Sequence, residues 1–283
     1  MKKSIDEALK MLQDGVHEIL QSDNYRRYLL VMSRFHHYST NNCILIAMQR
    51  PDATCVAGYS TWKSLGRTVK HGEHGIRILA PCPVRKHKDE DGAVVTVEKD
   101  AEEVTMMLFK AVSVFDYSQT EGKPLPSFGP DELAGECAQY DELLNAITQT
   151  CPVPVRFADI PGGAKGYYHL TDREIVIQSG MGASQTIKTA LHETAHSILH
   201  SEKGTVKDRH QEETEAESVA FVVCTHFGID TSDYSFPYLA GWSSSADGKE
   251  ILDSLDTIRR TAGSLISDLE LVLQEDSHEG RAS

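Results

Sequence analysis

Two histidines and a glutamate lie within one short stretch, residues 189–200, that contains the pattern His192-Glu193-x-x-His196. On an α-helix, residues four apart share a face, so both imidazoles can reach one metal ion while Glu193 flanks the same place. Two imidazole nitrogens, a further ligand and an open position for water make up a zinc hydrolase site. The metal lowers the pKa of that water to about 7, and a nearby carboxylate accepts its proton. The pattern therefore predicts a Zn²⁺ site with Glu193 as catalytic base.

The residues around this pattern favour a helix. Ile187, Leu191, Ala195 and Leu199 recur every four residues as an apolar stripe, and Gly204 can end the element. The alternative is a helix that merely carries two surface histidines. A third ligand would decide between the two.

The next stretch, 210–226, predicts a second amphipathic helix, with carboxylates crowded into its first turns. Its apolar face consists of small residues that allow close packing on the first helix: Ala216, Val219, Ala220, Val223 and Cys224. A His-Glu-x-x-His helix followed by Glu-x-Glu-Ala-x-x-x-Ala resembles the compact gluzincin peptidases. The resemblance implies Glu213 as third zinc ligand and Glu217, on the same helical face, as the residue that holds a histidine ligand in place.

Two other carboxylates of this helix are weaker candidates for the third ligand. On a helix, Glu215 points about 160° and Glu212 about 100° away from Glu213. The alternative for the whole acidic cluster is compensation of the helix dipole, which any run of acids at a helix start provides.

Composition places the chain among ordinary two-domain proteins. It has 283 residues, enough for about two domains, each with its own core. It contains no run of 18 apolar residues, and a charged helix is expected at its start, so we expect neither a membrane span nor a signal peptide. The six cysteines include no CxxC pair, which is typical of reduced, cytoplasmic core residues.

The net charge of −14 is unevenly distributed: residues up to Leu125 sum to +1 and the remainder to −15. Residues 60–88 carry a local charge of +6, with Glu73 as their one acid. A basic segment in an acidic protein is a candidate surface for nucleic acid.

Three motifs follow one another in this first half: Tyr38-Ser-x-Asn-Asn, Trp62-Lys-x-x-Gly-Arg and Lys70-x-Gly-Glu-x-Gly-Ile. Their order, together with the downstream His-Glu-x-x-His, resembles ArdC-type antirestriction proteins and related mobile-element proteins. The resemblance spans nearly the whole chain and implies a domain that binds single-stranded DNA joined to a zinc peptidase-like domain.

Single strands are bound by basic side chains along the phosphates and by aromatic faces that stack on bases. The candidates for both roles are Tyr38, Tyr59, Trp62, Lys63, Arg67, Lys70 and Arg77. The alternative is a core tryptophan beside a solvated basic turn, because aromatic residues are core residues by default.

The pattern of elements predicts an α+β protein of two domains. Helices at 5–21, 25–35, 43–49 and 60–65 precede strands at 76–84, 94–97 and 106–115, which should form a small antiparallel sheet. The Gly- and Pro-rich segment 118–130 is the best candidate linker, so we place the domains at 1–125 and 126–283. The second domain should hold a helix at 131–150, a strand at 153–157, a hairpin at 167–177, the two motif helices and a closing helix at 249–273.

Together these features predict a cytoplasmic zinc metallopeptidase that binds single-stranded DNA and cleaves a peptide or protein. Zinc held by His192, His196 and Glu213 would polarise a carbonyl group, and Glu193 would act as base and then as proton donor. Two alternatives stay open: a zinc fold that only binds, and an acidic second half that imitates the charge of DNA. Neither alternative needs Glu193.

Overall fold

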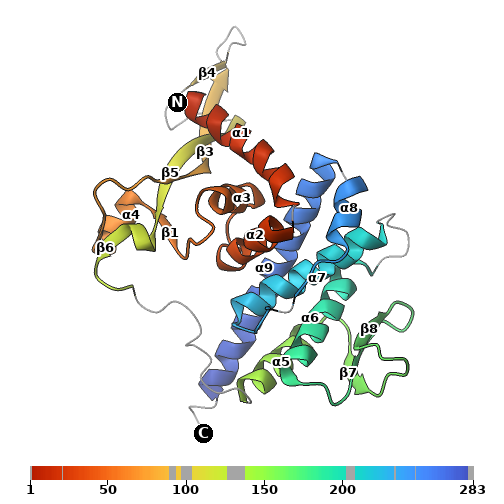
Figure 1. Cartoon of the computed structure of the whole chain (residues 1–283). Helices are drawn as coiled ribbons and strands as arrows, with labels where there is room; N and C mark the ends of the chain where they lie inside the picture. Colours follow the sequence, from red (N-terminus) through yellow and green to blue (C-terminus); the bar gives the residue numbers. More distant parts are fainter. Residues whose placement is uncertain are drawn as a thin grey trace. The chain divides into compact units, whose positions relative to one another are not determined.

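The computed structural model describes residues 2–20, 22–88, 94–96, 104–125, 138–201, 208–232, 234–245 and 247–279. The chain forms two compact units (Figure 1). The first comprises Met1–Gly15 and Ile44–Lys123, and the second comprises Val16–Cys43 and Pro124–Ser283. Among the described residues, no helix has the length and apolar character needed to span a bilayer.

The first unit is built on antiparallel strands. Its elements, in chain order, are α1 (Lys2–Ile19), α3 (Thr40–Gln49), β1 (Val56–Gly58), α4 (Tyr59–Ser64), β2 (Arg67–Val69), β3 (Ile76–Lys88), β4 (Val94–Thr96), β5 (Val104–Asp116), a 3-10 turn (Tyr117–Gln119) and β6 (Thr120–Gly122). α1 and α3 each continue into the second unit. The strands form one sheet in the order β1-β5-β3-β4 and a small β2-β6 pair. Every pairing in this unit is antiparallel, as predicted.

Asp116, at the end of β5, organises the loops of the first unit. Its carboxylate accepts hydrogen bonds from the backbone N–H groups of Thr54 (2.7 Å), Cys55 (3.1 Å) and Ser118 (2.9 Å). It also caps the 3-10 turn in a capping box with Gln119. Burial opposes ionisation of Asp116, but these hydrogen bonds outweigh it and lower the pKa of the carboxyl below its ordinary value.

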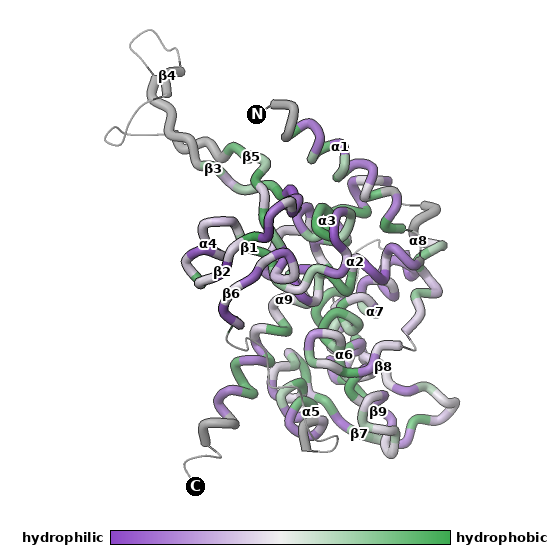
Figure 2. The backbone as a smooth tube through the Cα atoms, turned by 60° about the vertical axis from the view of Figure 1, so that its left-hand side comes forward, coloured by the Kyte–Doolittle hydropathy of each residue, from purple (hydrophilic) through white to green (hydrophobic). Residues whose placement is uncertain are grey.

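The second unit is mainly helical. Its elements are α2 (Ser22–Arg34), α5 (Ala138–Thr150), β7 (Val155–Ala158), β8 (Gly166–His169), β9 (Glu174–Gln178), α6 (Ala183–Leu199), α7 (Arg209–His226), α8 (Leu239–Ser245) and α9 (Gly248–Glu279). The sheet has the order β7-β9-β8, with β7 parallel and β8 antiparallel to β9. The core lies where α6, α7 and α9 pack together, and the tube in Figure 2 shows hydrophobic segments along these helices.

The small residues predicted on the apolar face of α7 are buried. Ala216, Val219, Ala220, Val223 and Cys224 are all fully inaccessible to solvent. Small side chains let helix axes approach closely, which brings the polar residues at the start of α7 up to the middle of α6. This packing sets the distance between the two halves of the candidate site.

Several predicted elements differ in extent from the observed ones. The closing helix runs from Gly248 to Glu279, and a short helix, α8, lies between α7 and α9, where no element was predicted. Within the predicted linker, Thr120–Gly122 form a strand that pairs with Arg67–Val69. Residues 126–137, which include the rest of that linker and the expected start of α5, lie outside the described residues, and so does the connection between the predicted strands 76–84 and 94–97 at residues 89–93. The domain boundary at residue 125 stays a prediction.

Candidate metal centre

His192 and His196 lie one turn apart on α6, and their Nε2 atoms are 3.1 Å from each other. The Glu213 carboxylate enters from α7, with Oε2 at 3.6 Å from Nε2 of His192 and 3.7 Å from Nε2 of His196. All three side chains are partly buried. Within the described part of the chain, these residues form the one group of three whose ligand atoms could hold a metal ion.

The spacing of these three atoms suits a small divalent cation. For bonds of about 2.0–2.1 Å in tetrahedral geometry, ligand atoms lie roughly 3.3 Å apart. The three observed separations, between 3.1 and 3.7 Å, bracket that value. Two imidazoles and one carboxylate also leave one tetrahedral position for water or substrate. The residues therefore fit a divalent metal without rearrangement of either helix.

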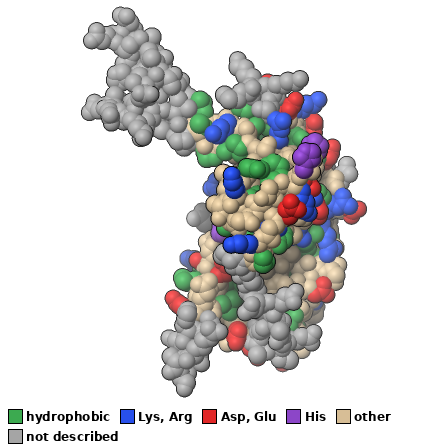
Figure 3. All heavy atoms as spheres, turned by 90° about the vertical axis from the view of Figure 1, so that its left-hand side faces the viewer, with side chains coloured by type: hydrophobic (Ala, Val, Ile, Leu, Met, Phe, Trp, Pro, Cys, Tyr) green, Lys and Arg blue, Asp and Glu red, His purple; other side chains and the backbone are tan. Residues whose placement is uncertain are grey.

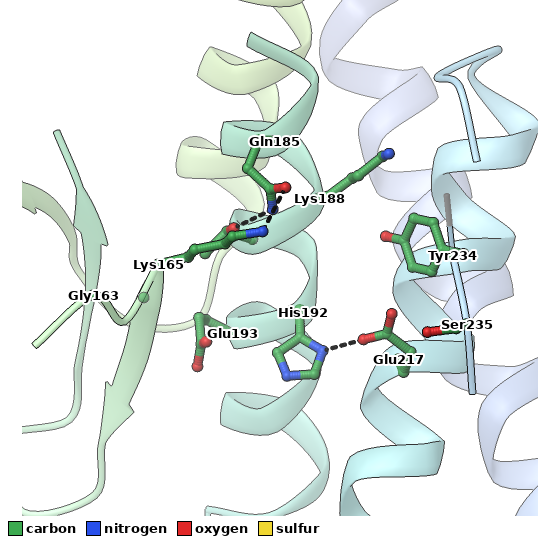
Figure 4. Close-up of a pocket in the computed structure, with 11 residues that line it drawn as sticks. Gly163, Lys165, Gln185, Lys188, His192, Glu193, Glu217, Tyr234 and Ser235 are labelled. Atoms are coloured by element: carbon green, nitrogen blue, oxygen red, sulfur yellow. Dashed lines mark hydrogen bonds and ion pairs between the residues drawn. The ribbon is translucent and has the colours of Figure 1, made fainter. Parts of the chain in front are cut away.

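Glu217, one turn after Glu213 on α7, lies behind His192. Its Oε2 is 3.2 Å from Nδ1 of His192, the ring nitrogen that faces away from the ligand cluster (Figure 4). Burial lowers the pKa of His192, but Glu217, Glu193 and Glu213 outweigh that effect and the net pKa is raised. A carboxylate at this nitrogen fixes the orientation of a ligating imidazole.

The second histidine, His196, is held by another histidine. Its Nδ1 atom is 3.0 Å from Nδ1 of His200, and Nε2 of His200 is 3.1 Å from Oε2 of Glu215. The sequence analysis did not nominate His200 and treated Glu215 only as a weaker candidate ligand. The signal was present, because His200 continues the four-residue spacing of His192 and His196.

Glu193 lies beside the ligand cluster, and only 8% of its surface is exposed. Burial raises the pKa of this carboxyl, against a lowering by His192 and His196. The backbone of Tyr168, on β8, forms a hydrogen bond with the carboxylate. A buried position and one backbone donor suit a carboxylate that must both accept and release a proton.

Gly166 allows β8 to approach α6 closely enough for this contact. A Cβ atom at position 166 would lie 2.6 Å from Cγ2 of Thr189 and 3.3 Å from Cγ of Glu193. Any other residue would therefore push β8 or the Glu193 side chain away. The hairpin was predicted to begin at residue 167, and Gly166 is in fact the first residue of its first strand.

Two open hollows flank the cluster, and His192, Glu193 and Gly166 line both. One, of about 480 Å³, also contains Lys165 and Lys188 (Figure 4). The other, of about 520 Å³, lies toward Glu212 and Tyr238. β8 is at the edge of its sheet and borders both hollows. His192 is thus accessible from both hollows, and His196 and Glu213 are accessible from the second.

Two of the seven predicted DNA-contacting residues are part of the core of the first unit. Trp62 is 1% exposed, and its indole N–H donates to the carbonyl of Phe115 at 2.8 Å. Arg67 is 5% exposed, donates to the Thr120 hydroxyl at 2.8 Å and lies over the Tyr117 ring. The prediction that Trp62 and Arg67 contact DNA is therefore corrected, because burial withdraws both side chains from any ligand. For Trp62, the alternative of a core tryptophan describes the observed placement.

The other predicted residues remain accessible. Tyr59 is 55% exposed, and Lys63, Lys70 and Arg77 are exposed as well. Tyr38 belongs to the second unit, where it packs edge-on against Phe35. On the face drawn in Figure 3, Lys and Arg side chains lie in several separate places among hydrophobic ones.

One exposed aromatic residue was missed by the sequence analysis. Phe109, on β5, is 57% exposed. Phe109 pairs with Pro81, and Ser113 pairs with Arg77, so Phe109 and Arg77 lie on the same face of the sheet. The strand pattern predicted Phe109 as part of the sheet but could not tell which face was covered.

Comparison with known proteins relates the chain to one family. Residues 1–115 match the family model described as the N-terminal domain of anti-restriction factor ArdC. The metal-free crystal structure of the antirestriction protein ArdC from plasmid R388 superimposes with a TM-score of 0.56 at 20% identity, covering 82% of this chain and 85% of that one. Its Mn(II)-bound structure gives 0.54 at 19% identity, with 83% and 85% coverage. Residues 1–115 thus form an ArdC-type N-terminal domain, and the chain is similar to ArdC in fold over most of its length.

The ArdC resemblance and the α+β fold of two domains predicted from the sequence are thereby confirmed. An uncharacterized protein of Bacillus anthracis is 28% identical over 316 aligned positions, which cover 97% of this chain. The chain spans about half of that curated relative, 53% of its length. The matched R388 structures share the fold, and one of them is described as binding Mn(II).

Proposed function

We propose that this protein is a zinc-dependent hydrolase of peptide bonds that also binds single-stranded DNA and acts in antirestriction. The observation that carries the hydrolase proposal is the convergence of His192, His196 and Glu213 beside the buried carboxylate of Glu193. A purely structural metal site needs only its ligands. The carboxylate of Glu193, which lies beside the ligands without being one of them, is therefore better explained by a catalytic role.

A zinc ion bound by these residues supplies Lewis acidity toward a carbonyl oxygen and acidifies a water molecule. Glu193 accepts the proton of that water and then delivers it to the departing amine nitrogen. The raised pKa of Glu193, which burial causes, favours the first of these transfers, because it makes the carboxylate a stronger base. Hydrogen bonding to the backbone of Tyr168 keeps the carboxylate beside the two histidines during both transfers.

The surroundings of the cluster support an extended substrate. β8 is an edge strand, and its free edge can pair with an added peptide strand through backbone hydrogen bonds. The hollows on either side of His192 offer room for side chains before and after the cleaved bond. We therefore propose an unfolded segment of protein, rather than a small molecule, as the substrate class.

The decisive experiment compares the wild-type protein with Glu193→Gln. The variant should retain about one zinc ion per chain and lose peptide cleavage by several orders of magnitude, because the amide cannot accept the proton. Glu142→Gln is the matched control, since Glu142 is exposed on α5 and lines neither hollow. Its cleavage rate should stay close to that of the wild type.

Equal cleavage by the wild type and Glu193→Gln would remove the assignment of Glu193 and indicate a contaminating protease. Zinc binding without any cleavage of a random-sequence peptide pool by either protein would favour a metal fold that only binds. Both measurements use the full chain.

The second candidate function is binding of single-stranded DNA by the first unit. The observation that favours it is the accessible combination of Tyr59, Phe109 and the cations Lys63, Lys70 and Arg77. Aromatic faces can stack on bases and cations can neutralise phosphates. The rival account is charge mimicry. In that account the net charge of −15 on residues 126–283 imitates the charge of DNA and so occupies a DNA-binding enzyme.

A further inference from the structure

We propose that His200 and Glu215 form a buried hydrogen-bond relay that positions the metal ligand His196. The inference rests on the metal site of the proposed function and adds two positioning residues to it. Both act through His196, since neither belongs to the ligand group itself.

The direction of each hydrogen bond in the relay follows from chemistry. A metal at Nε2 of His196 uses the lone pair of that nitrogen, so the proton of the neutral ring sits on Nδ1. That N–H donates to Nδ1 of His200 over 3.0 Å. The proton of His200 is then on Nε2, which donates to Oε2 of Glu215 over 3.1 Å. Each donor meets an acceptor, and the series ends on a carboxylate.

The carboxylate end of the relay is deeply buried and fully engaged. Glu215 has no exposed surface, and the His200 side chain is 6% exposed. The other carboxylate oxygen, Oε1, accepts from Gln211 Nε2 at 2.9 Å and from the Ser254 hydroxyl at 2.7 Å. A buried carboxylate costs several kcal/mol in desolvation unless it is paired in this way.

The two histidine ligands are thus supported by two carboxylates from the same helix. Glu217 contacts His192 directly, whereas Glu215 reaches His196 only through His200. On a helix, Glu215 and Glu217 point in different directions, so one helix could not bring both carboxylates directly to neighbouring imidazoles. His200 lies between Glu215 and His196 and connects them by two hydrogen bonds.

The same unit contains a second histidine–glutamate pair that serves as a control. His226, on α7, lies 2.9 Å from Glu270 on α9 and 3.2 Å from the carbonyl of Ser33. It has the same chemistry as the His200–Glu215 pair but no contact with the ligand group. Loss of this pair removes a comparable interaction without altering His196.

The test measures binding of Co²⁺ and Zn²⁺ to the full chain by chelator competition, with the visible absorption of Co²⁺ as a report of ligand geometry. His200→Leu should lower the affinity about 10–100-fold and shift the Co²⁺ spectrum. His200→Gln should keep most of the wild-type metal affinity and a Co²⁺ spectrum close to that of the wild type. Its side-chain carbonyl can accept a hydrogen bond from His196 while its amide N–H donates to Glu215. His226→Leu should leave both unchanged.

A merely structural role gives a different result. In that case His200→Leu would lose metal affinity only to the extent that the unfolding temperature of its metal-free form falls. Its Co²⁺ spectrum would match that of the wild type, and His226→Leu would show the same losses as His200→Leu. Unchanged affinity in His200→Leu would overturn the relay while leaving the metal site intact. If no metal binds to the wild type either, the proposed function fails and the relay fails with it.

A second variant covers the case in which His200→Leu does not fold. Glu215→Gln keeps the side-chain volume and an acceptor for His200 but removes the charge at the end of the relay. Its metal affinity should fall several-fold. Wild-type affinity and an unaltered Co²⁺ spectrum in Glu215→Gln would overturn the proposal without reference to His200→Leu.

Discussion

The two imidazoles of the candidate metal centre are the part of the site that sequence spacing determines most directly. Residues four apart on a helix always lie on the same face, so the helix alone brings the rings of His192 and His196 together. Glu213 required more, because a carboxylate from another helix meets them only if α6 and α7 pack at the right depth. The resemblance to gluzincins supplied that step, and the geometry of the three atoms agrees with it.

Removal of either type of ligand should abolish high-affinity metal binding. We expect His196→Ala and Glu213→Ala each to lose most of the zinc that the wild type binds, because two ligands do not close a tetrahedral site. Metal analysis after gel filtration measures the content. Glu212→Ala is the control and should bind zinc like the wild type, and full zinc content in Glu213→Ala would exclude Glu213 as a ligand.

Gly166 gives a test of the catalytic base that leaves the ligands untouched. Gly166→Ala would place a methyl group against Thr189 and Glu193, so β8 or the carboxylate must move. We expect zinc content to be retained and peptide cleavage to fall by about 100-fold, the cost of misplacing a reacting group by roughly 1 Å. Gly182→Ala, whose Cβ would meet no atom within 4 Å, should cleave at the wild-type rate. Equal rates for both variants would contradict the proposed role of β8.

At the scale of elements, the spacing of hydrophobic residues predicted the long helices and strands. It did not predict the burial of side chains that are covered by a segment distant in the sequence. Trp62 and Arg67 are the instructive cases. A tryptophan beside basic residues has the composition of a stacking site, but Trp62 is hydrogen-bonded to the end of β5 and Arg67 to β6, both more than 50 residues further along. Short strands such as β2 and β6 were missed for the same reason, since three residues carry no period of their own.

Asp116 should be the most sensitive polar position of the first unit. Asp116→Ala removes the acceptor of three backbone N–H groups from the segments before β1 and after β5. We expect the free energy of unfolding to fall by about 3 kcal/mol at pH 7, because buried donors lose a charged partner. Urea denaturation of the full chain measures the difference.

The stability that Asp116 contributes should depend on pH with a defined sign. Its pKa is lower in the folded protein, so the unfolded state binds the proton more readily at acid pH. The contribution is fully present above the unfolded pKa of about 3.9 and is lost as pH falls below it. The stability difference between wild type and Asp116→Asn should therefore shrink as pH is lowered from 5 to about 3. A constant difference over this range would contradict the prediction.

For the whole molecule, the sequence predicted two compact parts, their α+β class and their uneven charge, because all three follow from composition and from the order of elements. It could not show that residues 16–43 fold with the second half of the chain, since no local pattern records which distant segment a helix will cover. The spacing of His200 was visible in the sequence, whereas the burial of Glu215 at the end of the relay was beyond reach for a related reason. It depends on Ser254 of α9, 39 residues after Glu215.

The charge distribution leads to a salt-dependence test of DNA binding. The full chain should bind single-stranded oligonucleotides with an affinity that falls steeply as salt rises, because phosphate neutralisation releases counterions. Replacing Lys63, Lys70 and Arg77 together by alanine should weaken binding and flatten the slope of log affinity against log salt by roughly 2 units. Fluorescence anisotropy at several salt concentrations measures both.

A variant with the same change in net charge controls for long-range electrostatics. Lys165, Arg173 and Lys249 are exposed cations of the second unit, and their replacement should leave the slope nearly unchanged. If both triple variants lower affinity equally, binding reflects overall charge and not a surface of the first unit. If the wild type shows no affinity for single strands even at low salt, charge mimicry becomes the better account.

The hydrogen bond between Ser254 and Glu215 also bears on the order in which the protein is made. α6 and α7 leave the ribosome before α9, so a growing chain carries all three candidate ligands while the buried carboxylate behind them still lacks its serine donor. Domains made during synthesis fold roughly in the order in which they emerge. The metal site would then reach its final affinity only after the last helix has docked, and a nascent chain would hold its metal loosely until that moment.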